Sequence, residues 1–223
     1  MHIDTIFCPK VDGRPERFLY VAIERTSKWL YIEARASREA KEAALFMENL
    51  IKRCPLKIHT ILTDNGVEWK ADFEEMVTDP DRAIKYRHTK PRTPQTNGCV
   101  ERMNGTIKRK TPFKTKAFWV ARPEEQMTPG RLLQGAYPTG TRLARANASV
   151  RQYTFFWNAV LPHKLLNWQT PLKLLQALYK EKPELFNFDP SRDMPLDLED
   201  WKSRIGANQF IYPPPGIGNR TPS

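Results

Sequence analysis

Three carboxylates stand at positions where a charged side chain needs an explanation. Asp4 lies inside the apolar run 2–8, Asp64 ends the apolar segment 57–63, and Glu101 is the only acid among twelve lysines and arginines between residues 82 and 122. An unpaired charge in an apolar strand is costly, so each acid needs a partner. Converging carboxylates repel one another unless a cation lies between them, and ligands that are all oxygens suit Mg²⁺ or Mn²⁺ rather than zinc. The three acids therefore form a candidate site for a hard divalent cation.

Each of these acids also has an ordinary explanation. Asp4 could pair with a neighbouring lysine or arginine, Asp64 opens an Asp-Asn-Gly sequence that is common in turns, and Glu101 could lie on a helix surface. Six other side chains that often act in functional sites are expected to be structural or incidental here, with both tryptophans in the core: His2, His59, His88, His163, Trp157 and Trp168.

The elements around these acids predict a mixed sheet. Apolar and β-branched residues indicate strands at 2–8, 17–24 and 28–32, with Asp12-Gly13 as the turn of a hairpin. Ser37 is expected to cap a helix that ends before Pro55. The segment 57–63 is apolar on both faces, as in a central strand, and a helix at 69–78 and a strand at 83–88 follow.

This order places two of the acids close together. A hairpin meander followed by a right-handed crossover allows the strand that ends at Asp64 to lie parallel to the strand that carries Asp4. Glu101 falls on the helix expected at 96–110, and further helices are expected at 141–160 and 172–179. The carboxylates of Asp4 and Asp64 are then expected near one end of the sheet.

Composition narrows the class of partner. The 223 residues include 36 Lys and Arg against 25 Asp and Glu, a formal charge of +11 that favours nucleic acid first and an acidic membrane surface second. No segment has the roughly 18 apolar residues of a membrane span, and Asp4 interrupts any secretory leader. Cys8, Cys54 and Cys99 form no CxxC pair. We therefore expect a cytoplasmic protein with reduced thiols.

Three ordered motifs carry a family resemblance. The segments His2-Ile3-Asp4, Leu62-Thr-Asp-Asn-Gly66 and Pro94-Gln-Thr-Asn-Gly-Cys-Val-Glu-Arg-Met-Asn104 resemble the D-D-E catalytic core of the retroviral-integrase superfamily, most closely insertion-sequence transposases. The 36 residues between Asp64 and Glu101 match the family's usual separation. Further on, Phe156-Trp-Asn158, Pro162-His163 and Gln169-Thr-Pro171 are similar to the family's closing segment.

The resemblance implies an α/β fold of the ribonuclease-H type, a mixed five-stranded sheet flanked by helices, with a helical C-terminal extension. We expect the catalytic core at 1–111, an irregular insertion at 112–140 and closing helices of the core at 141–180. The extension, partly irregular, is expected at 181–223.

The resemblance also implies an activity and a cofactor. Asp4, Asp64 and Glu101 would hold two Mg²⁺ or Mn²⁺ ions for metal-dependent cleavage and joining of DNA strands by in-line displacement at phosphorus. Water would be the nucleophile for cleavage, and the freed 3′-OH the nucleophile for joining. The partner would be DNA, both transposon ends and target, bound by a homo-oligomer, with no membrane involved.

Residues near Glu101 are expected to contact DNA. Asn97, Asn104 and Lys108 share a helix face with Glu101, so they are placed to position phosphates beside the metals. Other cations are expected to neutralise further phosphates: Arg92, Arg102, Arg109 and Lys110.

Two other functions remain open. A nuclease of the same fold would cut DNA without joining it, and strand-transfer assays would then yield only nicks. A non-catalytic DNA-binding remnant of a transposase would keep the basic surface and show no response to divalent metal.

Overall fold

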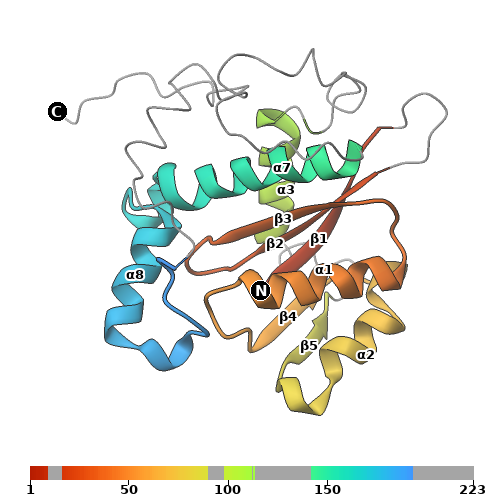
Figure 1. Cartoon of the computed structure of the whole chain (residues 1–223), viewed down its shortest axis with the longest axis horizontal. Coiled ribbons are helices and arrows are strands. Elements are labelled where there is room, and N and C mark those ends of the chain that lie inside the picture. The colour runs from red at the N-terminus through yellow and green to blue at the C-terminus, as the bar shows by residue number, and fades with distance from the viewer. Residues whose placement is uncertain (10–16, 90–97, 112, 114–141, 193–223) are drawn as a thin grey trace.

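Five strands form one mixed sheet, in the order β3-β2-β1-β4-β5 (Figure 1). The computed structural model describes residues 1–9, 17–89, 98–111, 113 and 142–192. The strands are β1 (His2–Phe7), β2 (Phe18–Ile23), β3 (Leu30–Arg35), β4 (Thr60–Thr63) and β5 (Lys85–His88). β1, β2 and β3 are antiparallel neighbours, whereas β4 runs parallel to both β1 and β5. The predicted mixed sheet, with the strand before Asp64 beside the strand of Asp4, is confirmed.

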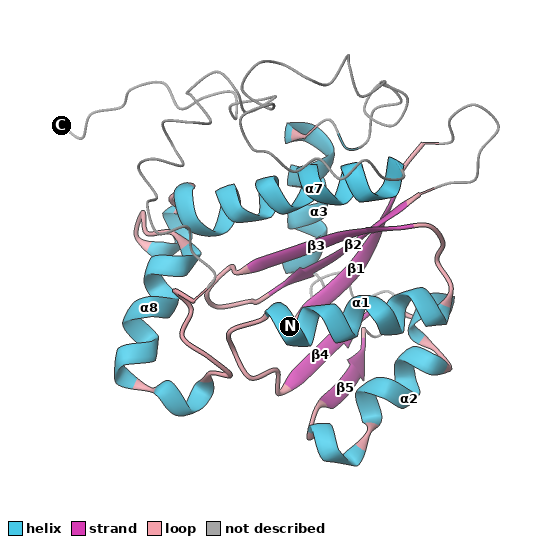
Figure 2. Ribbon diagram, viewed as in Figure 1, coloured by secondary structure: helices cyan, strands magenta, loops and turns pink. Residues whose placement is uncertain are grey.

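Helices cover both faces of this sheet (Figure 2). α1 (Ala40–Arg53) and α2 (Asp72–Thr78) lie on one face, and α3 (Gly98–Lys110) and α7 (Arg142–Phe155) on the other. A π-helical turn, η5 (Phe156–Val160), continues α7, and α8 (Pro171–Glu181) follows at one end of the sheet. Short 3-10 helices complete the described chain: η1 (Val67–Trp69), η2 (Pro80–Arg82), η6 (Lys164–Leu166) and η7 (Pro183–Leu185). Among the described residues, no helix has both the length and the apolar character needed to cross a bilayer.

Strand alternation divides the apolar residues between two cores. Ile3 points to the α1 side, where it joins Phe46 and Trp69, while Ile6 points to the α3 side and joins Met103. β2 is buried along its whole length because both faces are covered. Asp4 has the parity of Ile6 and therefore lies on the face covered by α3.

Two expectations about single residues are wrong. α1 begins at Ala40 with Glu39 as its N-cap residue, and the carbonyl of Ser37 instead accepts a hydrogen bond from the Tyr20 hydroxyl at 3.2 Å. Trp168, expected in the core, is 69% exposed because the preceding tight turn directs it outward. Apart from Phe113, which is buried in the α3-side core, the expected insertion 112–140 lies outside the described residues, as does the extension beyond residue 192.

Two asparagines cover the outer edge of β3. Asn147 of α7 accepts from the Ala34 N–H at 2.7 Å and donates to the Ala34 carbonyl at 2.9 Å. Asn158 of η5 pairs with Leu30 in the same way, at 2.8 and 2.7 Å. An edge strand leaves such backbone groups unpaired, so the two amides replace part of a missing neighbour strand and attach α7 to the sheet.

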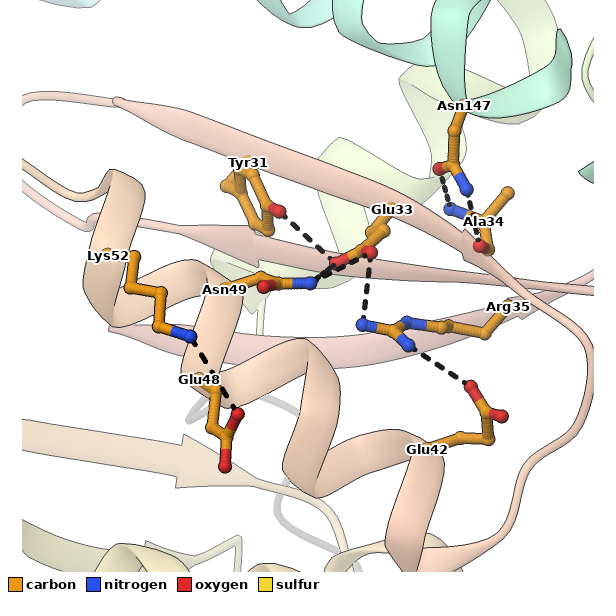
Figure 3. A network of polar contacts seen from close by, with 9 residues as sticks. All are labelled: Tyr31, Glu33, Ala34, Arg35, Glu42, Glu48, Asn49, Lys52 and Asn147. Atoms are coloured by element: carbon orange, nitrogen blue, oxygen red, sulfur yellow. Dashed lines mark hydrogen bonds and ion pairs between the residues drawn. The ribbon is translucent and has the colours of Figure 1, made fainter. Parts of the chain in front are cut away.

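A polar network attaches α1 to the α1-facing side of β3 (Figure 3). The carboxylate of Glu33 accepts hydrogen bonds from the Tyr31 hydroxyl and the Asn49 amide, both at 3.1 Å, and forms an ion pair with Arg35 at 3.0 Å. Arg35 also contacts Glu42 at 3.3 Å. These contacts position α1 and the loop before it, which carries Arg38 towards the end of β1.

Candidate active site

Asp4 lies in β1, and Asp64 directly follows the last residue of β4, the parallel neighbour of β1. In the ladder between β1 and β4, His2 is opposite Leu62, and each aspartate comes two residues further along its own chain. Side chains two residues apart project from the same face of a strand. The register places the two predicted aspartates at the same level, and the charge of Asp64 acts on Asp4.

Two hydrogen bonds hold the carboxylate of Asp4. Its Oδ1 accepts from the Thr5 N–H at 2.7 Å, and its Oδ2 accepts from the Asn104 amide at 2.7 Å. The pKa of Asp4 is raised from 3.8 to about 6, mainly by burial and then by the negative charges of Asp64 and Glu68, against the opposing effects of the Thr5 N–H and Lys108. The site thus has an excess of negative charge that a cation would neutralise.

Asp64 is held by the turn that follows it. Its Oδ1 accepts from the Gly66 N–H at 2.9 Å and from the buried indole of Trp69 at 2.7 Å. The carbonyl of Asp64 lies 3.3 Å from Nδ1 of His88, a residue that we expected to be incidental. Because Trp69 belongs to the α1-side core, packing of that core fixes the orientation of the Asp64 carboxylate.

A buried acid that the sequence analysis missed lies beside this pair. Glu68 is 2% exposed, its Oε1 accepts from the Thr5 hydroxyl at 2.9 Å, and its Oε2 lies 3.3 Å from Nε of Arg38. A Cβ at Gly66 would be 2.4 Å from Oε2 of Glu68 and 3.0 Å from Oδ1 of Asp64. The two carboxylates thus approach the same point, and a glycine leaves room for both. The available signal was weak: one acid between Val67 and Trp69.

α3 contributes an amide and a cation to the site. Asn104 is 5% exposed, and its buried Oδ1 accepts no hydrogen bond from the described residues. The charge of Lys108, one turn further along, acts on Asp4. Glu101 lies one turn before Asn104 and is exposed, and the structure places it in contact with neither aspartate among the described residues. Its membership of the site stays a prediction.

The remaining predicted DNA contacts are divided between exposed positions and undescribed ones. Arg102, Lys108, Arg109 and Lys110 are exposed on α3, whereas Arg92 and Asn97 lie outside the described residues. Asn104 is directed at Asp4 instead of solvent, so its expected phosphate contact also stays a prediction.

Two solved structures with a similar fold come from retroviral integrases. The BIV integrase catalytic core domain superposes with a TM-score of 0.52 at 19% identity, covering 82% of this chain and 95% of that one. The fold is that of an integrase catalytic core. A chain of the simian T-cell lymphotropic virus intasome, in complex with PP2A regulatory subunit B56 gamma, has a TM-score of 0.53 at 18% identity and covers 78% of this chain. This chain spans 52% of the length of that intasome chain. No family model and no curated protein matches the sequence.

The donors at this end of the sheet are of the kind that suits a hard divalent cation. Asp4 and Asp64 offer carboxylate oxygens, and the buried Oδ1 of Asn104 is a further oxygen without a hydrogen-bond donor in the described chain. In the part of the chain that the structure describes, no three His, Cys, Asp or Glu side chains are grouped closely enough to hold a metal. Asp4 and Asp64 are thus two of the three predicted carboxylates, and among the described residues Glu101 is not grouped with them.

Proposed function

We propose that this chain is the catalytic domain of a DNA transposase or integrase that cleaves a DNA strand and joins the 3′ end to a target. The observation that carries the proposal is the Asp4–Asp64 pair, matched in level across two parallel strands and approached by Asn104 and Lys108 from α3. The integrase-like fold supports it, because the pair lies on a sheet shared with integrase catalytic cores.

Asp4, Asp64 and Glu101 are the residues that would hold two Mg²⁺ or Mn²⁺ ions. When bound, such ions activate the attacking oxygen and stabilise the leaving 3′ oxygen of an in-line displacement. The protein holds the ligands in place beforehand: the Trp69 indole orients Asp64, and the Asn104 amide orients Asp4.

Glu68 acts in this proposal as a positioning residue. It attaches the turn after Asp64 to β1 through Thr5, and to the loop before α1 through Arg38. These contacts limit the movement of the Asp64 carboxylate relative to Asp4.

DNA is the proposed partner, bound through phosphates and by a homo-oligomer. The charge of Lys108 acts on Asp4, and its ammonium would contact the phosphate that reacts. The other exposed cations of α3, Arg102, Arg109 and Lys110, would contact phosphates further along the strand, together with Arg92 and Asn97.

Two assays with Mg²⁺ or Mn²⁺ test the proposal: nicking of supercoiled plasmid and strand transfer between oligonucleotides. We expect Asp64→Asn and Glu101→Gln to abolish both reactions, while Glu75→Gln, which removes the same charge from an exposed position on α2, leaves them unchanged.

The same assays separate the alternatives. Nicks without joined products would favour the nuclease, and DNA binding without any metal response would favour the non-catalytic remnant. Full activity of Glu101→Gln together with an inactive Glu68→Gln would overturn the assignment of Glu101.

A further inference from the structure

A pocket lined by cations opens beside the amino-terminal half of α3. Its volume is about 350 Å³, and it lies between α3, the turn that links β2 to β3, and the segment 157–165. Four basic residues line it, and no acid of the described chain does: Arg25, Lys28, Arg102 and Lys164. Sites for small ligands begin at about this volume.

These cations lack acidic partners. In the described part of the chain, none of the four forms an ion pair with a carboxylate. For Arg25 and Lys28 the acid nearest in sequence is Glu24, whose carboxylate instead accepts hydrogen bonds from the N–H groups of Thr26 and Ser27 at 2.5 to 3.0 Å. Glu101 precedes Arg102 in the sequence but does not line the pocket. The pocket therefore has a net positive potential that suits an anionic ligand.

The aromatic wall of the pocket is fixed in place. The indole of Trp157 donates to the Lys28 carbonyl at 2.9 Å, and its ring packs against His163 with centroids 4.2 Å apart. Met103 and Ile23 add further apolar surface. A flat apolar wall beside cations matches a molecule with both a planar ring and a negative charge.

The loop 163–169, at the rim, exposes large apolar side chains. An isolated bridge between His163 and Gln169 closes this loop, and Asn167 and Trp168 have left-handed backbone angles, with φ of 53° and 62°. Such a conformation is unusual for tryptophan. In this loop the side chain of Trp168 is 69% exposed and that of Leu165 is 73% exposed. An exposed indole is a stacking platform for an unpaired base.

We propose that this pocket binds one nucleotide of a single-stranded segment of DNA. The phosphate lies among Arg25, Arg102 and Lys164, the base lies on the Trp157 wall, and the next base stacks on Trp168. Bases within a duplex are stacked and paired, so they reach neither the pocket nor the exposed indole. The inference rests on the proposed function for the identity of the polymer as DNA.

Fluorescence anisotropy with a labelled thymidine oligonucleotide and the full chain tests the proposed binding of single-stranded DNA. A chelator is present so that no strand is cut. Arg25→Gln combined with Lys164→Gln should weaken binding about tenfold and lower the salt slope by about one. Trp168→Ala should also weaken it about tenfold. The matched control is Lys173→Gln combined with Lys180→Gln, which removes two exposed charges from α8 and should leave affinity within about twofold.

A hairpin duplex separates single-strand recognition from general attraction. The pocket variants should weaken duplex binding no more than the α8 control does. Equal losses for the pocket and α8 variants, or a loss confined to the duplex, would overturn the inference while leaving the proposed function standing. If the wild-type chain bound neither the single-stranded oligonucleotide nor the duplex, both the inference and the proposed function would be overturned.

Discussion

Asp4→Asn should stabilise the protein in the absence of metal while abolishing its activity. The structure raises the pKa of Asp4 to about 6 from 3.8, so the folded protein holds this proton more tightly than the unfolded chain does. The ionised carboxylate therefore destabilises the fold, and the stability of the wild type should fall as the pH rises from about 4 to about 6. Replacing the carboxylate with an amide removes this charge.

The expected gain in stability follows from the shift in the pKa of Asp4. A pKa difference of about two units corresponds to about 3 kcal/mol, or roughly 6–12 °C in Tm for a chain of this length. The hydrogen bonds survive the change, because the new amide oxygen still accepts from the Thr5 N–H. The new amide N–H can donate to Oδ1 of Asn104, which has no donor among the described residues, once the Asn104 amide turns over.

Urea unfolding in the presence of EDTA, at several values between pH 4 and pH 8, measures the difference in the free energy of unfolding between Asp4→Asn and the wild type. Above pH 6 the variant should be more stable than the wild type by about 3 kcal/mol, and near pH 4 the two should coincide. Mn²⁺ at pH 7 should raise the Tm of the wild type more than that of the variant, since a bound cation offsets the charge of Asp4. Glu75→Gln, at an exposed position, should reproduce neither difference.

Two results would refute the argument. A variant that is less stable than the wild type at pH 7 would show that Asp4 is a net stabilising ion in the apo protein. A difference that does not change with pH would show that packing, and not the charge of the carboxylate, controls stability at this position.

Three further changes test the rest of the site. Glu68→Gln removes a negative charge that raises the pKa of Asp4, so an NMR titration of the Asp4 carboxyl should give a midpoint below that of the wild type, and an unchanged midpoint would contradict the proximity. Gly66→Ala places a Cβ 2.4 Å from Oε2 of Glu68 and should lower the free energy of unfolding by about 1–3 kcal/mol and weaken nicking, as urea unfolding and the plasmid assay would show. Replacing the cations at 108–110 with glutamine should reduce the salt slope of duplex binding by about two to three, whereas no change would place the phosphates elsewhere.

Local patterns were sufficient to predict the framework of this protein. The alternation of β-branched and aromatic residues located all three strands of the meander, and Pro55 marked where α1 had to end. The apolar character of both faces of the segment before Asp64 indicated a central strand, and β4 does lie between β1 and β5. With the handedness of crossovers, this was enough to place Asp4 beside Asp64.

Long-range contacts account for what the sequence did not reveal. Trp168 is a large apolar residue of the kind expected in a core, but the backbone conformation of its turn directs the side chain outward. Asn158 lies in the Phe156-Trp-Asn158 motif, but its hydrogen bonds to the edge of β3 are made with Leu30, 128 residues away. Contacts between residues so far apart in the sequence cannot be predicted from the residues next to them.

The sequence alone determined which residue types were available for chemistry and which strands carry them, because hydrophobic periodicity and turn residues act over a few positions. The tertiary structure decided how the site is held. Glu68 is buried where the Thr5 hydroxyl of β1 and the guanidinium of Arg38, which precedes α1, contact its carboxylate. The pKa of Asp4 is likewise set by burial and by charges that come from other segments of the chain. Burial and electrostatic interaction depend on distance in space, which only the folded chain defines.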